Sequence, residues 1–410
     1  MRLLIVNQYG LPAGRPGITR HGDLGAALVR MGHDVVVLAS RFNYLTRSER
    51  QTSRVEQHEG VEFRWLNTGS YAGNDRSRIG SMLRFTARAV WEGSRIARPD
   101  VVLASSPHLL AGLAGILISR RHGVPFVFEV RDLWPSVLVD LGAVRRGSVV
   151  HQALVTLERR CYRSADRIVT VPPHADRRVA ELGVDARKCV HIPNATSAVS
   201  GAGIPLPRSL MEVLDDAGER ELLVYAGAQG VSNGLDSVLL GLAQLRSVDR
   251  PTFDRLAVLV VGDGGQHTEL VDAAQRLGLG NIRFHPPIEK ATIPGLLERA
   301  DFLLVSFADA PVYGYGLSPN KLFDYLAAGR PVLLATRLHD TAVSEADAGR
   351  TFTPGSAKSF AAELRALLSA TPPEREAMGE RGRRLVEQRY TISTTAAQLD
   401  ALLRDVSRRG

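Results

Sequence analysis

The segment Gly314–Leu334 combines helix-start signals with residues that could bind a phosphorylated ligand. It reads GYGLSPNKLFDYLAAGRPVLL. Ser318 is a good N-cap, and Pro319 suits the first helical position because its missing N–H costs nothing there. We expect a helix over Asn320–Ala328, which Gly329 ends in the left-handed conformation.

The first turn of this helix has the chemistry to hold a nucleotide. The N–H groups of Asn320, Lys321 and Leu322 would point out of the helix start, where a diphosphate is favoured. Lys321 adds a full positive charge at the same point. Asp324 shares that helical face, and its carboxylate could accept hydrogen bonds from both hydroxyls of a ribose. The alternative is an ordinary surface helix with a Lys–Asp pair.

Two charged residues follow another predicted strand directly. Arg131 and Asp132 come after Phe126–Val130, so we expect them at the carboxyl end of a strand, where α/β sheets bind ligands. Asp132 could take a proton from an acceptor hydroxyl or hold a sugar, and Arg131 could neutralise phosphate charge. The alternative is a buried structural pair. Glu129 is expected to point the other way, because side chains alternate along a strand.

Short β-branched runs alternate with helical stretches along the chain, which predicts βαβ units and parallel sheets. Continuous apolar runs such as LAVLVV suit strands that helices cover on both faces. The strands are expected at Leu3–Val6, Val35–Ala39, Val61–Leu66, Val101–Ala104, Phe126–Val130, Ile168–Val171, Leu222–Ala226, Ala257–Gly262, Ile282–His285, Phe302–Ser306 and Val332–Ala335.

We predict two Rossmann-like doubly wound domains, at 1–195 and 208–390, with a ligand-binding cleft between them. The segment Pro193–Pro207 is rich in Gly, Pro, Ser and Ala and has no periodicity, which is typical of a linker. The residues 391–410 are predicted to form a C-terminal helix that could pack back on the N-terminal domain.

The composition is that of a globular protein, with 44% hydrophobic and 23% charged residues. The two cysteines, Cys161 and Cys189, cannot support a disulfide scaffold, so a reducing, cytoplasmic location is expected. No apolar run approaches the roughly 20 residues of a membrane span. No D-x-D triplet or His/Cys cluster indicates a metal site, and no orthodox G-x-G-x-x-G follows the first strand.

The positive charge is concentrated in the first half of the chain. Residues 1–200 contain 28 Lys and Arg against 17 Asp and Glu. The segment Arg76–Arg98 interleaves six arginines with apolar residues, and four of the six fall near one helical face, which suits peripheral contact with an anionic membrane surface. A solvated helix is the alternative. With only 6% aromatic residues and dispersed basic residues, nucleic-acid binding is not expected.

Several motifs together give the chain a family resemblance. In order, they are LLIVNQYG, GITRHGDLGAALVRMGHDVVVL, FVFEVRDLWPSVL, IPNATS, LLVYAGAQGVSNGLDSVLLGL, LVVGDGGQ and SPNKLFDYLAAGRPV. The chain resembles the retaining glycosyltransferases of family 4, which have the GT-B fold, especially the branch that serves O-antigen and capsule assembly. The resemblance implies a nucleotide-sugar donor held by the C-terminal domain and an acceptor received by the N-terminal domain.

By this resemblance, Lys321 and its helix start hold the donor diphosphate, Asp324 holds the ribose, and Gly262 lines the base pocket through its backbone. Ser318 and Gly227 belong to the same predicted donor site. The chain departs from the wider family because Gly316 stands where many members have a glutamate. It also offers Gln229, Ser232 and Asn233 where an Arg…Lys pair is usual.

The missing cations suggest that the diphosphate needs a donor from the N-terminal domain. Arg20 is the candidate, because it follows the loop containing Gly17 and begins the first helix; a solvated helix-start residue is the alternative. The resemblance implies retaining transfer without a metal or other cofactor, and a UDP-N-acetylhexosamine is the favoured donor. The acceptor would be a lipid-linked glycan or a small molecule. A non-catalytic sugar-nucleotide sensor and a UDP-N-acetylglucosamine 2-epimerase are the alternatives.

Overall fold

The computed structural model describes residues 1–410 except 16, 44–47, 51, 52, 72, 74, 75, 107, 198–203 and 410. The chain forms two compact units. The first contains Met1–Asn194, Tyr315–Ser318 and Ile392–Gly410, and the second contains Ala195–Gly314 and Pro319–Thr391. The predicted linker Pro193–Pro207 lies partly outside the described residues.

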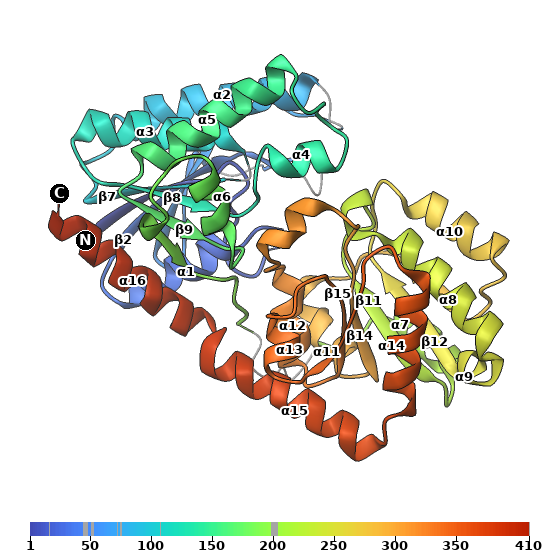
Figure 1. The fold of residues 1–410 in the computed structure, drawn as a ribbon. Coiled ribbons are helices and arrows are strands. Elements are labelled where there is room, and N and C mark those ends of the chain that lie inside the picture. The colour runs from blue at the N-terminus through green and yellow to red at the C-terminus, as the bar shows by residue number, and fades with distance from the viewer. Residues whose placement is uncertain are drawn as a thin grey trace. The chain divides into compact units, whose positions relative to one another are not determined.

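The first unit is built on an eight-stranded sheet (Figure 1), in the order β10-β9-β8-β7-β1-β2-β6-β5. Every neighbouring pair is parallel except β5 with β6. The strands are β1 (Arg2–Val6), β2 (Asp34–Ser40), β5 (Val55–His58), β6 (Val61–Leu66), β7 (Val101–Ser106), β8 (Phe126–Val130), β9 (Arg167–Thr170) and β10 (Cys189–His191). A separate antiparallel pair joins β3 (Phe42–Asn43) to β4 (Ser48–Glu49).

Helices cover this sheet. On one face, α1 (Arg20–Arg30) and α16 (Ile392–Arg409) share a core with β1 and β2, so the C-terminal helix belongs to the first unit. Elsewhere in the unit, α3 lies close to the sheet because a Cβ at its Gly115 would contact Ala104 and Phe126. The remaining helices are α2 (Arg76–Gly93), α3 (Leu109–His122), α4 (Ser136–Asp140), α5 (Val149–Ser164), α6 (Ala175–Glu181) and the 3-10 turn η1 (Ala186–Lys188).

The second unit has a six-stranded parallel sheet in the order β13-β12-β11-β14-β15-β16. Its strands are β11 (Glu221–Ala226), β12 (Leu256–Val261), β13 (Ile282–His285), β14 (Phe302–Val305), β15 (Val332–Ala335) and β16 (Gly349–Phe352). Two separate apolar cores lie on its faces. The strands alternate side chains between these cores, as buried parallel strands must.

Each core is closed by its own helices. One core contains residues of α8 (Leu235–Val248), α9 (Arg250–Asp254), α10 (His267–Arg276) and α14 (Ala357–Ser369). The other contains residues of α7 (Arg208–Ala217), α11 (Ile293–Leu297), α12 (Asn320–Ala327), α13 (Ala342–Glu345) and α15 (Pro372–Arg389). Short 3-10 turns complete the unit at η2 (Val231–Asn233), η3 (Lys290–Thr292) and η4 (Pro311–Tyr315).

Both sheets confirm the predicted doubly wound α/β class. In the second sheet the strands run in the Rossmann order, which reverses between β11 and β14. The first sheet reverses in the same way between β1 and β7. Ligands of open α/β sheets bind outside the carboxyl ends of the strands at such a reversal. The predicted strands are all present to within one or two residues. The short or polar strands β5, β10 and β16 were not predicted.

Candidate functional site

The second unit brings the start of α12 to the end of β11, which is one of the two strands at its topological reversal. Lys321 of α12 donates a hydrogen bond from Nζ to the hydroxyl of Tyr225 on β11, over 2.9 Å. The same Nζ lies 4.1 Å from the centre of the Tyr225 ring, which adds a cation–π attraction. Lys321, the residue predicted to contact a diphosphate, therefore lies at the strand end where ligands of such sheets bind.

Lys321 is half-buried, whereas its place at a helix start predicts an exposed side chain. Burial disfavours the charged ammonium and lowers the pKa of Lys321 to about 7. No carboxylate of the described chain forms an ion pair with it. An anion placed beside Nζ would favour the ammonium, so a bound phosphate would raise the pKa again.

Glycine residues make room for this arrangement. At Gly227, which follows β11, a Cβ would lie 2.5 Å from Lys321 Nζ. At Gly262, which follows β12, a Cβ would collide with the Gly227 carbonyl, and at Gly264 it would collide with Gln229. The loops after β11 and β12 therefore pack backbone to backbone, and larger residues there would separate them.

Gln229, where the family has a cation, is a structural link between these loops. Its side chain is buried, donates a hydrogen bond to the Gly262 carbonyl over 2.8 Å, and contacts His267 Nδ1 at 2.7 Å. Both ends of the amide are thus occupied within the protein. Ser232 and Asn233 lie in the turn η2 before α8.

The helix start differs from the prediction by one residue. Pro319, not Ser318, is the N-cap of α12, and its carbonyl accepts the N–H of Leu322. Of the three N–H groups expected to point out, that of Leu322 is therefore engaged in the first turn. The Ser318 hydroxyl instead accepts the N–H of Asn194 over 3.1 Å, and Ser318 belongs to the first unit.

The remaining residues of α12 follow the prediction more closely. Asn320 is exposed at the first helical position, and Asp324 is half-buried one turn further on. The helix ends at Ala327, one residue earlier than expected, and Gly329 has a left-handed φ of +69°. At Gly316, where many family members have a glutamate, φ is +105° and a Cβ would collide with the ring of Pro173. This backbone cannot accommodate a carboxylate side chain there.

Arg20 departs most clearly from the prediction that it binds the donor diphosphate, because its guanidinium is buried and hydrogen-bonded to other parts of the protein. It donates from Nε to Glu129 over 2.9 Å, from Nη1 to the Pro193 carbonyl over 2.6 Å and from Nη2 to the Ile192 carbonyl over 2.9 Å. Only 5% of Arg20 and none of Glu129 is exposed. Neither the donor-binding role nor the solvated alternative fits these contacts. Arg20 joins α1 to β8 and to the segment that follows β10.

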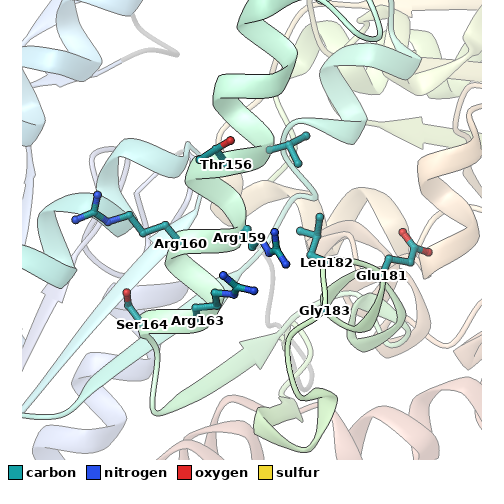
Figure 2. A pocket seen from close by; sticks show the side chains of 9 residues that line it. Thr156, Arg159, Arg160, Arg163, Ser164, Glu181, Leu182 and Gly183 are labelled. Atoms are coloured by element: carbon teal, nitrogen blue, oxygen red, sulfur yellow. The ribbon is translucent and has the colours of Figure 1, made fainter.

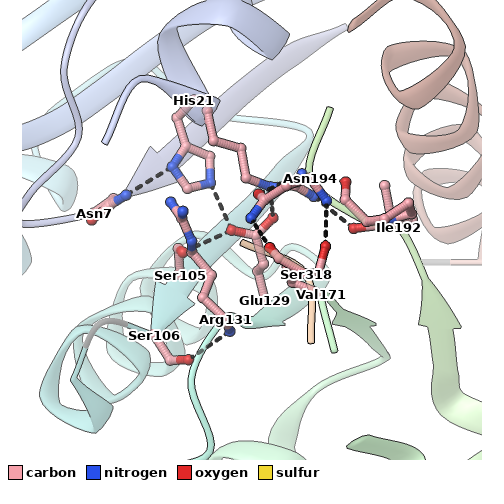
Figure 3. A network of polar contacts seen from close by, with 12 residues as sticks. Asn7, His21, Ser105, Ser106, Glu129, Arg131, Val171, Ile192, Asn194 and Ser318 are labelled. Atoms are coloured by element: carbon pink, nitrogen blue, oxygen red, sulfur yellow. Dashed lines mark hydrogen bonds and ion pairs between the residues drawn. The ribbon is translucent and has the colours of Figure 1, made fainter. Parts of the chain in front are cut away.

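The hydrogen bonds around Glu129 also fix a histidine tautomer (Figure 3). Asn7 accepts the Tyr9 N–H through Oδ1, so its Nδ2 must donate to His21 Nδ1, at 2.8 Å. The His21 proton then lies on Nε2, which is 3.0 Å from Glu129. Burial lowers the pKa of His21, and this outweighs the attraction of Glu129, so a neutral imidazole donates to the carboxylate.

Glu129 itself stays ionised. Burial alone would raise its pKa, but the charges of Arg20 and Arg131, together with the hydrogen bond from His21, hold that pKa well below its usual range. The expectation that Glu129 points away from the charged residues is wrong, because it lies at the centre of this buried network. It also accepts a hydrogen bond from Ser105 over 2.8 Å.

Arg131 and Asp132 lie directly after β8, as predicted. The Arg131 N–H donates to the Ser106 hydroxyl over 3.1 Å, and its side chain is half-buried, while Asp132 is exposed. Gly17 lies in a loop that the Leu11 N–H closes onto the Ile18 carbonyl over 2.9 Å, just before α1. These residues are all in the first unit.

The arginine-rich segment does not form the predicted face. The helix α2 ends at Gly93, so Arg95 and Arg98 lie beyond it. Arg98 donates to the carbonyls of His122 and Gly123 at the end of α3, and Arg84 donates to the Thr68 carbonyl. Three of the four arginines are thus not free on one helical surface.

A depression of about 590 Å3 lies beside α5 in the first unit (Figure 2). Arg159 and Arg163 face the Leu182–Gly183 turn, whereas Arg160 points away. None of the residues predicted from the sequence lines it. Arg163 is in the last turn of α5, where a positive charge stabilises the helix end, which accounts for its presence without a ligand.

In the part of the chain that the structure describes, no group of three or more His, Cys, Asp or Glu is placed to hold a metal ion. No described helix is long and apolar enough to cross a membrane.

Two family models match the chain. The Glycosyl transferase 4-like domain covers residues 17–195, and a Glycosyl transferase-like domain covers residues 243–401. Together with two doubly wound units, these matches define a glycosyltransferase of the GT-B fold. The chain belongs to the family 4 glycosyltransferases.

Similar proteins include the colanic acid biosynthesis glycosyl transferase WcaI of Escherichia coli (strain K12), 26% identical over 65% of this chain; the match spans only 61% of WcaI. A D-inositol 3-phosphate glycosyltransferase of Kineococcus radiotolerans is 27% identical over 100% of this chain and 96% of its own.

Two solved structures show the same fold at low identity. Sucrose-phosphate synthase of Thermosynechococcus elongatus superposes with a TM-score of 0.79 over 100% of both chains, at 16% identity. Anabaena HepE in complex with UDP superposes with a TM-score of 0.69 over 99% of this chain and 100% of its own, also at 16% identity.

Proposed function

We propose that the protein transfers a sugar from a nucleoside diphosphate donor to an acceptor hydroxyl, with retention at the anomeric carbon and without a metal. The second unit binds the donor and the first unit receives the acceptor. A UDP-N-acetylhexosamine is the proposed donor, and a lipid-linked glycan or a small molecule is the proposed acceptor. UDP as the nucleotide is supported by the neighbour that binds it.

The observation that carries this proposal is the position of Lys321. Its ammonium lies at the start of α12 beside Gly227, at the topological reversal of a Rossmann-ordered sheet. A diphosphate there would receive the Lys321 charge and the helix-start N–H groups of Asn320 and Lys321. Asp324, on the same helix, is proposed to accept the hydroxyls of the ribose.

The same groups would stabilise the leaving group. As the bond from the anomeric carbon to the diphosphate oxygen breaks, negative charge grows on the diphosphate, and a positioned ammonium stabilises that charge. The acceptor hydroxyl attacks near the face from which UDP leaves, and a diphosphate oxygen takes its proton. Gln229, Ser232 and Asn233 offer no cation where an Arg…Lys pair is usual, so charge stabilisation here depends on Lys321 and backbone N–H groups.

The deciding experiment is a panel of UDP- and GDP-sugars, measured first by thermal shift and then by UDP release. A ligand at 100 times its Kd adds about 2.7 kcal/mol to the stability of the folded state. The UDP-N-acetylhexosamines should give the largest shift, and Lys321→Ala should abolish it. A panel without any shift would refute the donor site.

A sugar-nucleotide sensor is the second candidate, because Gly316 leaves the family's carboxylate position empty of a side chain. A sensor would show the thermal shift but no UDP release with any acceptor. A UDP-N-acetylglucosamine 2-epimerase would instead release UDP or epimerise its substrate without an acceptor. Product analysis in the presence and absence of acceptor separates the three.

In the first unit, Asp132 and Arg131 are proposed to contact the acceptor or the donor sugar. Asp132 is exposed at the end of β8 and could accept the proton of an acceptor hydroxyl. If it does, Asp132→Asn should lower kcat while leaving UDP affinity unchanged. An unchanged kcat would assign Asp132 no part in transfer.

We also propose a cytoplasmic protein that contacts the inner face of the membrane through α2. Ile79, Leu83 and Trp91 are each more than half exposed and recur at steps of four and eight along the helix, so they form one apolar stripe. Arg88 lies between them in sequence and is exposed. An apolar stripe beside arginine suits the interface of an anionic bilayer better than it suits water.

A further inference from the structure

The hydroxyl of Tyr225 occupies a central place in the hydrogen bonds around Lys321. It donates to the Ala228 carbonyl over 2.6 Å and accepts from Lys321 Nζ over 2.9 Å. Burial raises the pKa of Tyr225, so the phenol stays neutral and can do both. The Tyr225 side chain is fully buried, so its position is set by packing.

A second tyrosine fixes the same strand end without contacting the ammonium. The Tyr325 hydroxyl accepts the Ala226 N–H over 2.7 Å and donates to the Ala226 carbonyl over 3.1 Å. Two tyrosine hydroxyls thus form hydrogen bonds with the backbone at the C-terminal end of β11, one from the strand itself and one from α12. Only Tyr225 also touches Lys321.

We propose that Tyr225 is a positioning residue for Lys321, which holds the ammonium beside Gly227 until the diphosphate of the donor takes it over. The ring and the hydroxyl supply two weak attractions for the ammonium, and a diphosphate supplies a stronger one. Glycine at position 227 leaves room for Nζ at this point, because a Cβ there would lie only 2.5 Å from it. This inference rests on the proposed donor site.

A dependence on pH follows from the same contacts. Among the described residues, Tyr225 on β11 is the titratable side chain that contacts the ammonium, and Asp324 and Tyr325 follow Lys321 on its own helix. The pKa of Lys321 in the free protein is about 7, and a bound diphosphate raises it. Donor affinity should therefore be full below pH 7 and fall up to tenfold per pH unit above it, with one proton taken up on binding at pH 8.

The test measures affinity for a UDP-sugar by calorimetry from pH 6.5 to 9, in two buffers that differ in ionisation enthalpy. Both phosphates of a UDP-sugar are esterified, so they lack the ionisation near pH 6 of a terminal phosphate. The buffer dependence counts the protons taken up by the wild-type protein, which needs no variant. Lys321→Arg, whose charge does not titrate here, should bind with no change over this range.

Tyr225→Phe keeps the ring and removes the hydroxyl. Without that acceptor the ammonium is less favoured, so the decline in affinity should begin at lower pH, and binding at pH 8 should weaken about three- to tenfold. The matched control is Tyr325→Phe, which removes the other phenol from the same strand end. It should leave the pH at which affinity declines unchanged.

The outcomes separate the inference from the proposed function. If Lys321→Ala does not weaken UDP-sugar binding, the donor site itself is wrong. Suppose that Lys321→Ala weakens binding but the affinity of Tyr225→Phe declines at the same pH as that of the wild-type protein. Tyr225 then does not position Lys321, and the donor site stands. The same conclusion follows if the wild-type protein takes up no proton on binding at pH 8. If the pH at which affinity declines shifts equally in Tyr225→Phe and Tyr325→Phe, the shift indicates only a loosened end of β11, and this result would also overturn the inference.

Discussion

Removing the Arg20 side chain should destabilise the first unit strongly. The size of the loss in unfolding free energy distinguishes a buried structural role of Arg20 from the donor-binding role that the sequence predicted. Arg20→Ala would leave the fully buried Glu129 carboxylate without its closest cation and would remove the donor to the carbonyls of Ile192 and Pro193. Breaking a buried ion pair by removing one partner costs about 3–5 kcal/mol. With an m-value of about 2 kcal/mol/M, the urea midpoint should fall by about 2 M.

The protein carries a natural probe for this measurement. Its three tryptophans, Trp65, Trp91 and Trp134, all lie in the first unit, so tryptophan fluorescence reports the unfolding of that unit alone. Arg30→Ala is the matched control, because Arg30 lies on the same helix as Arg20 and forms an exposed ion pair with Glu59 at the surface. It should change stability by less than about 0.5 kcal/mol.

The loss should also depend on pH with a definite sign. In the wild-type protein the pKa of Glu129 is lowered, so its contribution to stability is present at neutral pH and is lost as the pH falls. In Arg20→Ala, burial is no longer offset by the nearest positive charge, so the pKa of Glu129 should rise. In the variant, Glu129 can then take up a proton below neutral pH. The difference in unfolding free energy between the variant and the wild-type protein should therefore narrow from pH 7 to pH 5.

Two results would refute this reasoning. A urea midpoint within error of wild type, together with weakened UDP binding, would restore Arg20 as a donor ligand. A deficit that widens below pH 7 would mean that Glu129 is not the group left uncompensated. The double variant Arg20→Met with Glu129→Met removes both charges, and should recover part of the loss.

Lys321→Ala should lower kcat by about 10²–10³ on the best UDP-sugar, the range for one positioned electrostatic group, whereas the exposed Lys358→Ala should match wild type. Asp324→Ala should weaken UDP by about 1.5–3 kcal/mol in calorimetry whatever sugar is attached, and equal affinities would place Asp324 outside the site. Turnover should be unchanged in the presence of EDTA. If EDTA abolished turnover and added Mg²⁺ restored it, the proposed metal-free stabilisation of the leaving group would be wrong. Sedimentation with anionic vesicles at low salt should fall when Ile79 and Leu83 become Ser, and no binding by wild type would favour a soluble acceptor.

The sequence determined the elements and their order, because the signals for them are local. Runs such as LAVLVV and the break at Gly329 specify strands and helix ends from neighbouring residues alone. Sequence also placed Lys321 and Asp324 on one turn of α12, because helical spacing is fixed. The polar strand β5 and the three-residue β10 carried too little periodicity to be predicted.

Tertiary structure decided what the charged residues do, because their partners are distant in sequence. Arg20 meets Glu129 109 residues away and the Ile192 carbonyl 172 residues away, so its burial had no local signal. Lys321 meets Tyr225 96 residues away, which turned an expected surface ammonium into a half-buried one with a lowered pKa. Desolvation and ion pairing depend on everything packed around a group, and only the fold brings those atoms together.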